Sequence, residues 1–130
     1  MQIQSSDTGK CLTAHLPGSK GSGWVSMKMC RGAFGQKWTV FRNGVIRNTA
    51  TGQCLDVAVR KLTDAKDGSK VVTYKCHGNG NQRWNDAKGI LISGVSRKKN
   101  FCLEVGGWNK KENAAVNIWK CGKGQANQTW

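Results

Sequence analysis

Short hydrophobic runs separated by turn-forming residues characterise this chain. Residues 38–41 (Trp-Thr-Val-Phe) and 45–46 (Val-Ile) flank Asn43-Gly44, a dipeptide typical of a tight turn between antiparallel strands. Residues 84–92 repeat this strand–turn–strand pattern with a looser turn, and residues 71–74 and 116–119 are further β-prone runs. No stretch has the hydrophobic period and capping residues of a helix. The pattern therefore predicts an all-β protein.

A repeated Gln-x-Trp motif organises these strands. The motif occurs at residues 36–38, 82–84 and 128–130, so each copy lies 46 residues from the next. We expect the three tryptophans to be core residues, because a residue present in every repeat suits packing about a pseudo-threefold axis. We expect the paired glutamines to form hydrogen bonds inside the fold.

The six cysteines fall into the same frame. Three lie near the start of a repeat, and their partners in the frame follow 19, 22 and 19 residues later. Six cysteines allow fifteen pairings, and the most economical one joins them within repeats: Cys11–Cys30, Cys54–Cys76 and Cys102–Cys121. Each bridge would close a loop of about 20 residues, worth on the order of 3 kcal/mol in the chain-entropy model. Disulfides indicate an oxidising compartment and a secreted or extracellular protein.

Three repeats with no linker between them predict one domain over residues 1–130. Its repeats lie at about 1–43, 44–88 and 89–130, and are called unit one, unit two and unit three below. The alternative by period is a β-propeller, but three blades fall below the four that propellers usually need. We therefore predict a closed all-β domain with pseudo-threefold symmetry.

The sequence resembles the ricin B-chain type (R-type) lectin domains. The three Gln-x-Trp motifs, Cys-Leu-Asp-Val at residues 54–57 and the cysteine frame carry this resemblance, which spans the whole chain. It implies a β-trefoil fold and carbohydrate binding. It also implies three sugar contacts per unit: an acid just after the first Cys-Leu, an aromatic residue two before the second Cys, and the Asn of Asn-Gln-x-Trp.

These residue types suit a neutral sugar in water. An aromatic ring fits the C–H face of the sugar, while a carboxylate and an amide match its hydroxyl groups. By the resemblance, unit two has the full set, with candidate sugar-binding residues Asp56, Tyr74, Asn81 and a supporting Gln82. Related proteins often have Gln two residues before the aromatic, where this chain has Val72, so one polar contact is missing.

The other two units depart further from the pattern. The candidate residues of unit three are Glu104, Asn117, Trp119, Asn127 and Gln128. Glu in place of Asp moves the carboxylate about 1.5 Å farther out, so either the sugar sits differently or the site is weaker. Trp119 aligns with Tyr74 as a ligand platform, although packing against its disulfide is the alternative. Unit one has Thr13, Lys28 and Gly35 in the three places, and we predict no site there.

Charge suggests a second class of partner. The chain has 21 Lys and Arg against seven Asp and Glu, a formal net charge of +14. These residues are spread evenly over the units, which is typical of a solvated basic surface rather than of a nucleic-acid-binding arm. The one local cluster is residues 97–99 (Arg-Lys-Lys). The alternative function is therefore binding of anionic, heparin-like or sulfated glycans, which salt would weaken steeply.

Other classes of function lack support in the sequence. Asp56 and Glu104 occupy equivalent places in different units, too far apart for the paired carboxylates of a glycosidase, which lie roughly 5 to 10 Å apart. No CxxC pair occurs and His77 beside Cys76 has no partner motif, so we expect no metal and no other cofactor. No apolar run approaches the about 20 residues of a membrane span, so we expect no membrane insertion.

We therefore predict a carbohydrate-binding module without catalysis. The resemblance implies galactose- or N-acetylgalactosamine-type glycans, bound through up to two unit sites. Two sites on one domain favour multivalent glycans, because the second contact is intramolecular. The resemblance also implies a cell-surface lectin, or the binding part of a larger toxin, glycosidase or glycosyltransferase chain.

Overall fold

The chain folds into short antiparallel strands joined by loops and single 3-10 turns. The computed structural model describes residues 1–95 and 98–130, so Arg97 of the basic cluster lies outside the described residues. Within these ranges there are ten strands and no α-helix, which confirms the all-β prediction. The strands of unit one are β1 (Cys11–Ala14), β2 (Gly23–Lys28) and β3 (Trp38–Val40). Those of unit two are β4 (Ile46–Asn48), β5 (Cys54–Val57), β6 (Val71–Tyr74) and β7 (Trp84–Ala87). Those of unit three are β8 (Ile90–Ser93), β9 (Phe101–Val105) and β10 (Ala114–Lys120).

Four 3-10 turns lie in the described part of the chain. They are η1 (Leu62–Asp64), η2 (Gly80–Gln82), η3 (Gly106–Trp108) and η4 (Ala126–Gln128). The Asn-Gln pairs of units two and three lie on η2 and η4, and one residue separates each pair from the repeated tryptophan. None of the helices in residues 1–95 and 98–130 is long and apolar enough to cross a membrane.

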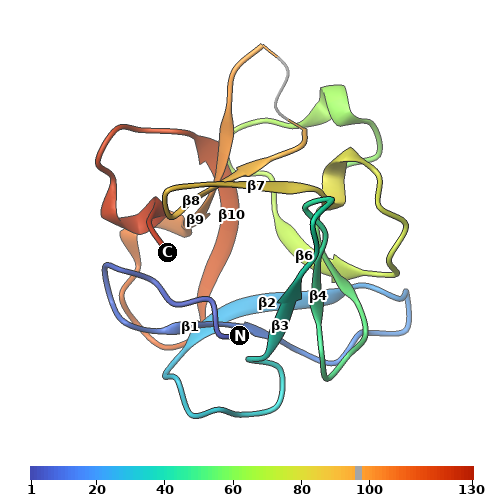
Figure 1. Cartoon of the computed structure of the whole chain (residues 1–130), viewed down its shortest axis with the longest axis vertical. Coiled ribbons are helices and arrows are strands. Elements are labelled where there is room, and N and C mark those ends of the chain that lie inside the picture. The colour runs from blue at the N-terminus through green and yellow to red at the C-terminus, as the bar shows by residue number, and fades with distance from the viewer. Residues whose placement is uncertain (96–97) are drawn as a thin grey trace.

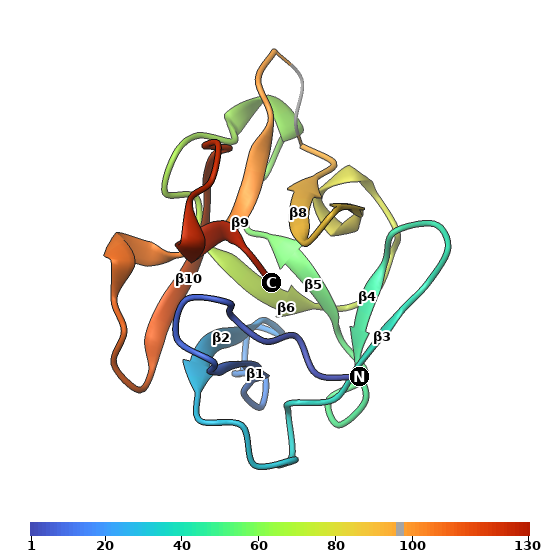
Figure 2. The ribbon, with the colours of Figure 1, turned by 60° about the vertical axis from the view of Figure 1, so that its left-hand side comes forward.

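The strands are connected in one network with threefold character. Their order is β3-β4-β5-β6-β2-β10-β9-β8-β7, with β1 paired to β2. The equivalent strands β2, β6 and β10 meet one another: β2 pairs with β6 through Gly23–Thr73 and with β10 through Ala114–Met27, and Lys70, just before β6, forms a bridge with Asn117 of β10. Figures 1 and 2 show the three units arranged around this meeting point. This is the closed pseudo-threefold arrangement that the repeat predicted.

The repeated tryptophans pack in the core, as expected. Trp38 and Trp84 are buried, and Trp130 packs partly buried against the same core cluster. Each indole N–H donates to the carbonyl of the leucine in its unit's Cys-Leu pair, over 3.0–3.2 Å: Trp38–Leu12, Trp84–Leu55 and Trp130–Leu103. These bonds join each Gln-x-Trp motif to the strand that follows its unit's first cysteine, which in units two and three carries the candidate acid.

The predicted disulfides are confirmed. All six cysteines lie in the described ranges and form the bridges Cys11–Cys30, Cys54–Cys76 and Cys102–Cys121. Three disulfides in a chain of this size indicate folding in an oxidising environment.

The predicted strand at residues 45–46 differs slightly from the one observed. Strand β4 begins at Ile46, because Val45 pairs instead with Arg83 of the next motif. Between the two hairpin strands, Gly44 adopts a φ of +90°, and a Cβ there would lie 2.6 Å from the Trp84 carbonyl oxygen. Only glycine suits this turn, which brings β4 beside the loops that follow β6.

Candidate functional site

The candidate acid of unit two is held by two amides. Asp56 lies on β5 and is only 4% exposed. The Gln82 Nε2 donates to its Oδ2 over 2.8 Å, and the Asn81 Nδ2 donates to its Oδ1 over 3.0 Å. Both amides come from η2, which follows the second cysteine of the unit. Each carboxylate oxygen therefore has an internal partner and retains lone-pair capacity for a ligand hydroxyl.

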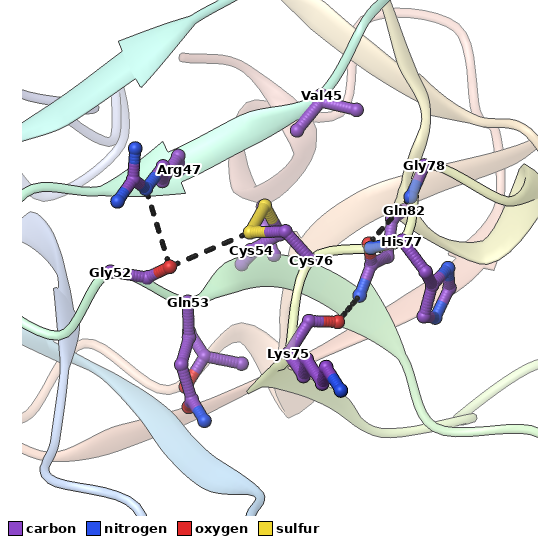
Figure 3. Close-up of a disulfide and its surroundings, with 12 residues drawn as sticks. Val45, Arg47, Gly52, Gln53, Cys54, Lys75, Cys76, His77, Gly78 and Gln82 are labelled. Carbon is purple, nitrogen blue, oxygen red and sulfur yellow. Dashed lines mark hydrogen bonds between the residues drawn. A yellow bond between two sulfur atoms is a disulfide. The ribbon is translucent and has the colours of Figure 1, made fainter.

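Gln82 is buried and acts as a clamp, meaning that its amide bonds three neighbouring segments together rather than contacting a ligand. Its Nε2 also donates to the Lys75 carbonyl over 2.9 Å, and its Oε1 accepts from the His77 and Gly78 N–H groups (Figure 3). The same three-way clamp is made by Gln36 in unit one and Gln128 in unit three. The glutamine thus joins the strand that carries the candidate acid to the loop after the second cysteine.

A pocket of about 850 Å³ opens over Asp56. Tyr74 on β6 lines one side and is 41% exposed. Asn81 lines another, and its Nδ2 is occupied by Asp56 and the Val57 carbonyl, so its Oδ1 is the atom left to accept from a ligand. Val72 presents an apolar side chain to the same pocket, consistent with the missing polar contact. The structure thus brings the predicted acid, aromatic and amide of unit two to one cavity.

His77 is a pocket residue that the sequence prediction missed. Its Nε2 lies 3.7 Å from Asp56 Oδ2, and its ring centre lies 6.4 Å from that of Tyr74. Its Nδ1 accepts from the Asn79 N–H over 3.0 Å, so the neutral ring carries its proton on Nε2, facing the carboxylate. The one sequence feature that could have indicated His77 is its position directly after Cys76. The other units have no histidine after their second cysteine, so the repeat did not single it out.

Unit three brings its predicted acid and amides together, with longer hydrogen bonds than in unit two. Glu104 lies on β9, is 5% exposed, and faces Asn117 of β10 in the strand register. Asn127 Nδ2 and Gln128 Nε2 both donate to its Oε1, over 3.3 and 3.2 Å, instead of one amide to each oxygen. Among the described residues, the buried Oδ1 atoms of Asn117 and Asn127 have no hydrogen-bond partner. Trp119 of the same unit is 44% exposed.

Unit one has a physical obstacle to a site of this kind. Gly35 occupies the place of the amide with a φ of +92°, and a Cβ there would collide with the Ala14 carbonyl oxygen. Thr13 occupies the place of the acid, and its Oγ1 accepts from Gln36 Nε2 over 3.2 Å. In this unit the neutral Thr13 hydroxyl therefore accepts the hydrogen bond from Gln36 that a carboxylate accepts in the other units. An amide side chain at position 35 would require the backbone to move.

The family model of the ricin-type beta-trefoil lectin domain matches residues 1–130. The chain belongs to this family. The match confirms the β-trefoil expectation and makes the chain an R-type lectin domain. The sequence matches no protein with a curated description.

Solved structures have the same fold as this lectin domain. A designed threefold-symmetric protein, ThreeFoil, is 23% identical, with a TM-score of 0.83 over 99% of this chain and 94% of that one. The C-half of an earthworm R-type lectin, solved with GalNAc, is 19% identical, with a TM-score of 0.77 over 98% and 92%. The trefoil lectin of the Vibrio vulnificus hemolysin/cytolysin, solved with N-acetyl-D-lactosamine, is 21% identical, with a TM-score of 0.73 over 98% and 88%.

Burial dominates the electrostatics of both acids in the lectin domain. Burial raises the pKa of Asp56 above the 3.8 of an unperturbed aspartate, and the hydrogen bonds from Gln82 and Asn81 offset part of this rise. Burial likewise raises the pKa of Glu104, with an added contribution from the nearby Asp67. Each carboxylate therefore takes up a proton at a higher pH than an exposed acid would.

Proposed function

We propose that this lectin domain binds galactose- or N-acetylgalactosamine-type glycans, chiefly through unit two. The observation that carries the proposal is the Asp56 carboxylate, held by two amides at a pocket that also exposes the Tyr74 ring. Such a carboxylate accepts from sugar hydroxyls, and the ring covers an apolar sugar face. The GalNAc and N-acetyl-D-lactosamine complexes of the earthworm and Vibrio lectins support this sugar class.

Unit three is proposed as a second, weaker site. Glu104, Asn117, Trp119, Asn127 and Gln128 would contact or support the sugar there. Its amides converge on one carboxylate oxygen, and two buried amide oxygens lack partners among the described residues, so its geometry is less complete than that of unit two. A glycan that reaches both sites would bind more tightly than a single sugar.

The proposed role is binding without catalysis, by one domain over residues 1–130 of a secreted or extracellular protein. Strands β6, β2 and β10 separate β5, which carries Asp56, from β9, which carries Glu104. This supports two separate binding sites rather than a pair of catalytic carboxylates. The Vibrio lectin, named as part of a hemolysin/cytolysin, supports a targeting role within a larger chain.

A glycan array at two salt concentrations tests the proposal. We expect binding to galactose- and N-acetylgalactosamine-terminated glycans to be nearly equal at about 0.15 M and about 0.5 M salt, a range over which binding driven by charge alone collapses. Neutral sugars release no counterions, so hydrogen bonds at Asp56 should depend little on salt. Binding confined to heparin-like or sulfated glycans, and lost at high salt, would contradict the proposal and favour the basic surface.

The raised pKa of Asp56 predicts a pH dependence of binding. The ionised carboxylate accepts hydrogen bonds from sugar hydroxyls, whereas the protonated form loses acceptor capacity. Because burial raises this pKa, affinity for N-acetyl-D-lactosamine should fall as the pH drops through a value above 3.8. Calorimetric titrations across this acidic range measure the effect, with far-UV circular dichroism as the control for folding. An affinity that stays constant while the protein remains folded would exclude a role for the carboxylate.

A further inference from the structure

A second pocket adjoins the candidate sugar pocket of unit two. It has a volume of about 680 Å³ and is lined by both cysteines of the Cys54–Cys76 disulfide. His77 and Gly78 line both pockets, so the two pockets are direct neighbours. Figure 3 shows this disulfide between Arg47 and His77. A glycan that extends from Asp56 past His77 would therefore reach the second pocket.

Two arginines line the second pocket, and a third lies beside one of its residues. Arg42 and Arg47 line it, and the Nε–H of Arg47 donates to the Gly52 carbonyl over 3.3 Å (Figure 3). Arg83 lines the candidate sugar pocket, and its Nε–H donates over 2.7 Å to the carbonyl of Gly78, which lines both pockets. In Arg47 and Arg83, the bond from Nε to a backbone carbonyl holds the side chain in place. The terminal guanidinium nitrogens of both residues are left to contact a ligand. None of the ion pairs found in residues 1–95 and 98–130 includes these arginines, and no Asp or Glu lines the pocket.

The charge of Arg47 is not required by the fold. The strand registers Gln4–Cys11, Arg47–Cys54 and Ile92–Cys102 show that Gln4 and Ile92 are its equivalents in the other units. Gln4 Nε2 donates to the Gly9 carbonyl over 2.8 Å, so a neutral amide makes the same backbone contact that Arg47 makes to Gly52. Of the three equivalent residues Gln4, Arg47 and Ile92, only Arg47 is a cation, and it belongs to the unit with the most complete candidate sugar site.

We propose that the pocket over the Cys54–Cys76 disulfide binds an oxyanion, a sulfate or carboxylate, carried by the glycan whose neutral sugar occupies the Asp56 pocket. The planar guanidinium of Arg47 binds an oxyanion through paired N–H donors, with Arg83 and Arg42 adding positive charge. The inference rests on the proposed function of unit two. It makes the preferred ligand of this lectin domain an acidic galactose-type glycan.

The test compares one neutral and several acidic probes. N-acetyl-D-lactosamine is titrated beside its forms sulfated on galactose at the 3- or 6-position and its sialylated forms, at about 0.15 M salt. We expect the wild-type domain to bind at least one acidic form about tenfold more tightly than the neutral form, and R47Q to lose this preference. Comparing the sulfated and sialylated probes shows which oxyanion fits. R83Q should reduce the same preference.

The matched control is K37Q, which removes one positive charge at the unit-one equivalent of Arg83. Lys37 is exposed and precedes Trp38 as Arg83 precedes Trp84, so K37Q should leave the preference for acidic glycans unchanged. Equal affinity of the wild-type domain for neutral and acidic probes would overturn the subsite alone. An equal loss in K37Q and R47Q would overturn it in favour of general charge attraction. If D56T binds every probe as tightly as the wild-type domain does, the proposed function is overturned, and the subsite with it.

Discussion

Replacing Asp56 with threonine should abolish sugar binding by unit two and leave the fold intact. The substitution copies unit one, where Thr13 Oγ1 accepts from the clamping glutamine in place of a carboxylate. Gln82 therefore keeps a partner, while the sugar loses hydrogen bonds to a charged acceptor. Hydrogen bonds of this kind contribute about 1.5–3 kcal/mol each, so the loss of even one should lower the affinity for N-acetyl-D-lactosamine at least about tenfold. Isothermal titration calorimetry measures the loss.

Two companion variants make this result specific. D56A removes the acid without offering an acceptor to Gln82, so it should lose binding and also about 1–3 kcal/mol of unfolding free energy. E104Q changes the weaker site of unit three, and should reduce avidity for multivalent glycans while single-sugar binding at unit two persists. If D56T binds the sugar as tightly as the wild-type domain, Asp56 is not the ligand acceptor.

Replacing Trp38 with alanine should produce the largest loss of stability. The side chain is 1% exposed in the core, and its Nε1 donates to the Leu12 carbonyl over 3.0 Å. Truncation of a buried tryptophan to alanine costs about 3–5 kcal/mol, because it leaves a cavity and here also a carbonyl without its donor. Urea unfolding with the disulfides intact, followed by far-UV circular dichroism, measures the change in unfolding free energy.

Trp108 provides the comparison for this variant. It lies on η3 and is 49% exposed, so W108A should change the unfolding free energy by no more than about 0.5 kcal/mol. Comparing the two variants distinguishes the loss of core packing in W38A from the general effect of removing a large aromatic side chain. Equal losses in W38A and W108A would mean that the repeated tryptophan is not the core element of its unit.

Much of the candidate site could be predicted because its residues occupy repeated positions. Asp56, Tyr74 and Asn81 stand in a frame set by two cysteines and one tryptophan, and the resemblance to R-type lectin domains implied that these positions belong together. The structure places all three on one pocket. His77 was missed because no equivalent histidine occurs in the other units, and only the course of the loop after Cys76 turns it toward the carboxylate.

The structure also explains why units one and three differ from unit two, which the residue types alone do not. Glu104 was expected to shift the site of unit three, but the convergence of both amides on Oε1 depends on side-chain geometry. Gly35 was seen as a missing amide, whereas its φ of +92° and the nearby Ala14 carbonyl show that no side chain fits there. Arg47 was one basic residue among 21 until the strand register placed it over the disulfide.

The sequence by itself determined the all-β class, the three repeats and the disulfide pairing. These features follow from short-range hydrophobic patterns and from motif and cysteine spacing, which are properties of the linear chain. The tertiary structure alone decided which pockets exist, how each carboxylate is bonded, and that a pocket lined by two arginines adjoins the one over Asp56. Those features depend on contacts between residues far apart in the sequence, such as Asp56 with Gln82 and Val45 with Arg83, whose geometry only folding defines.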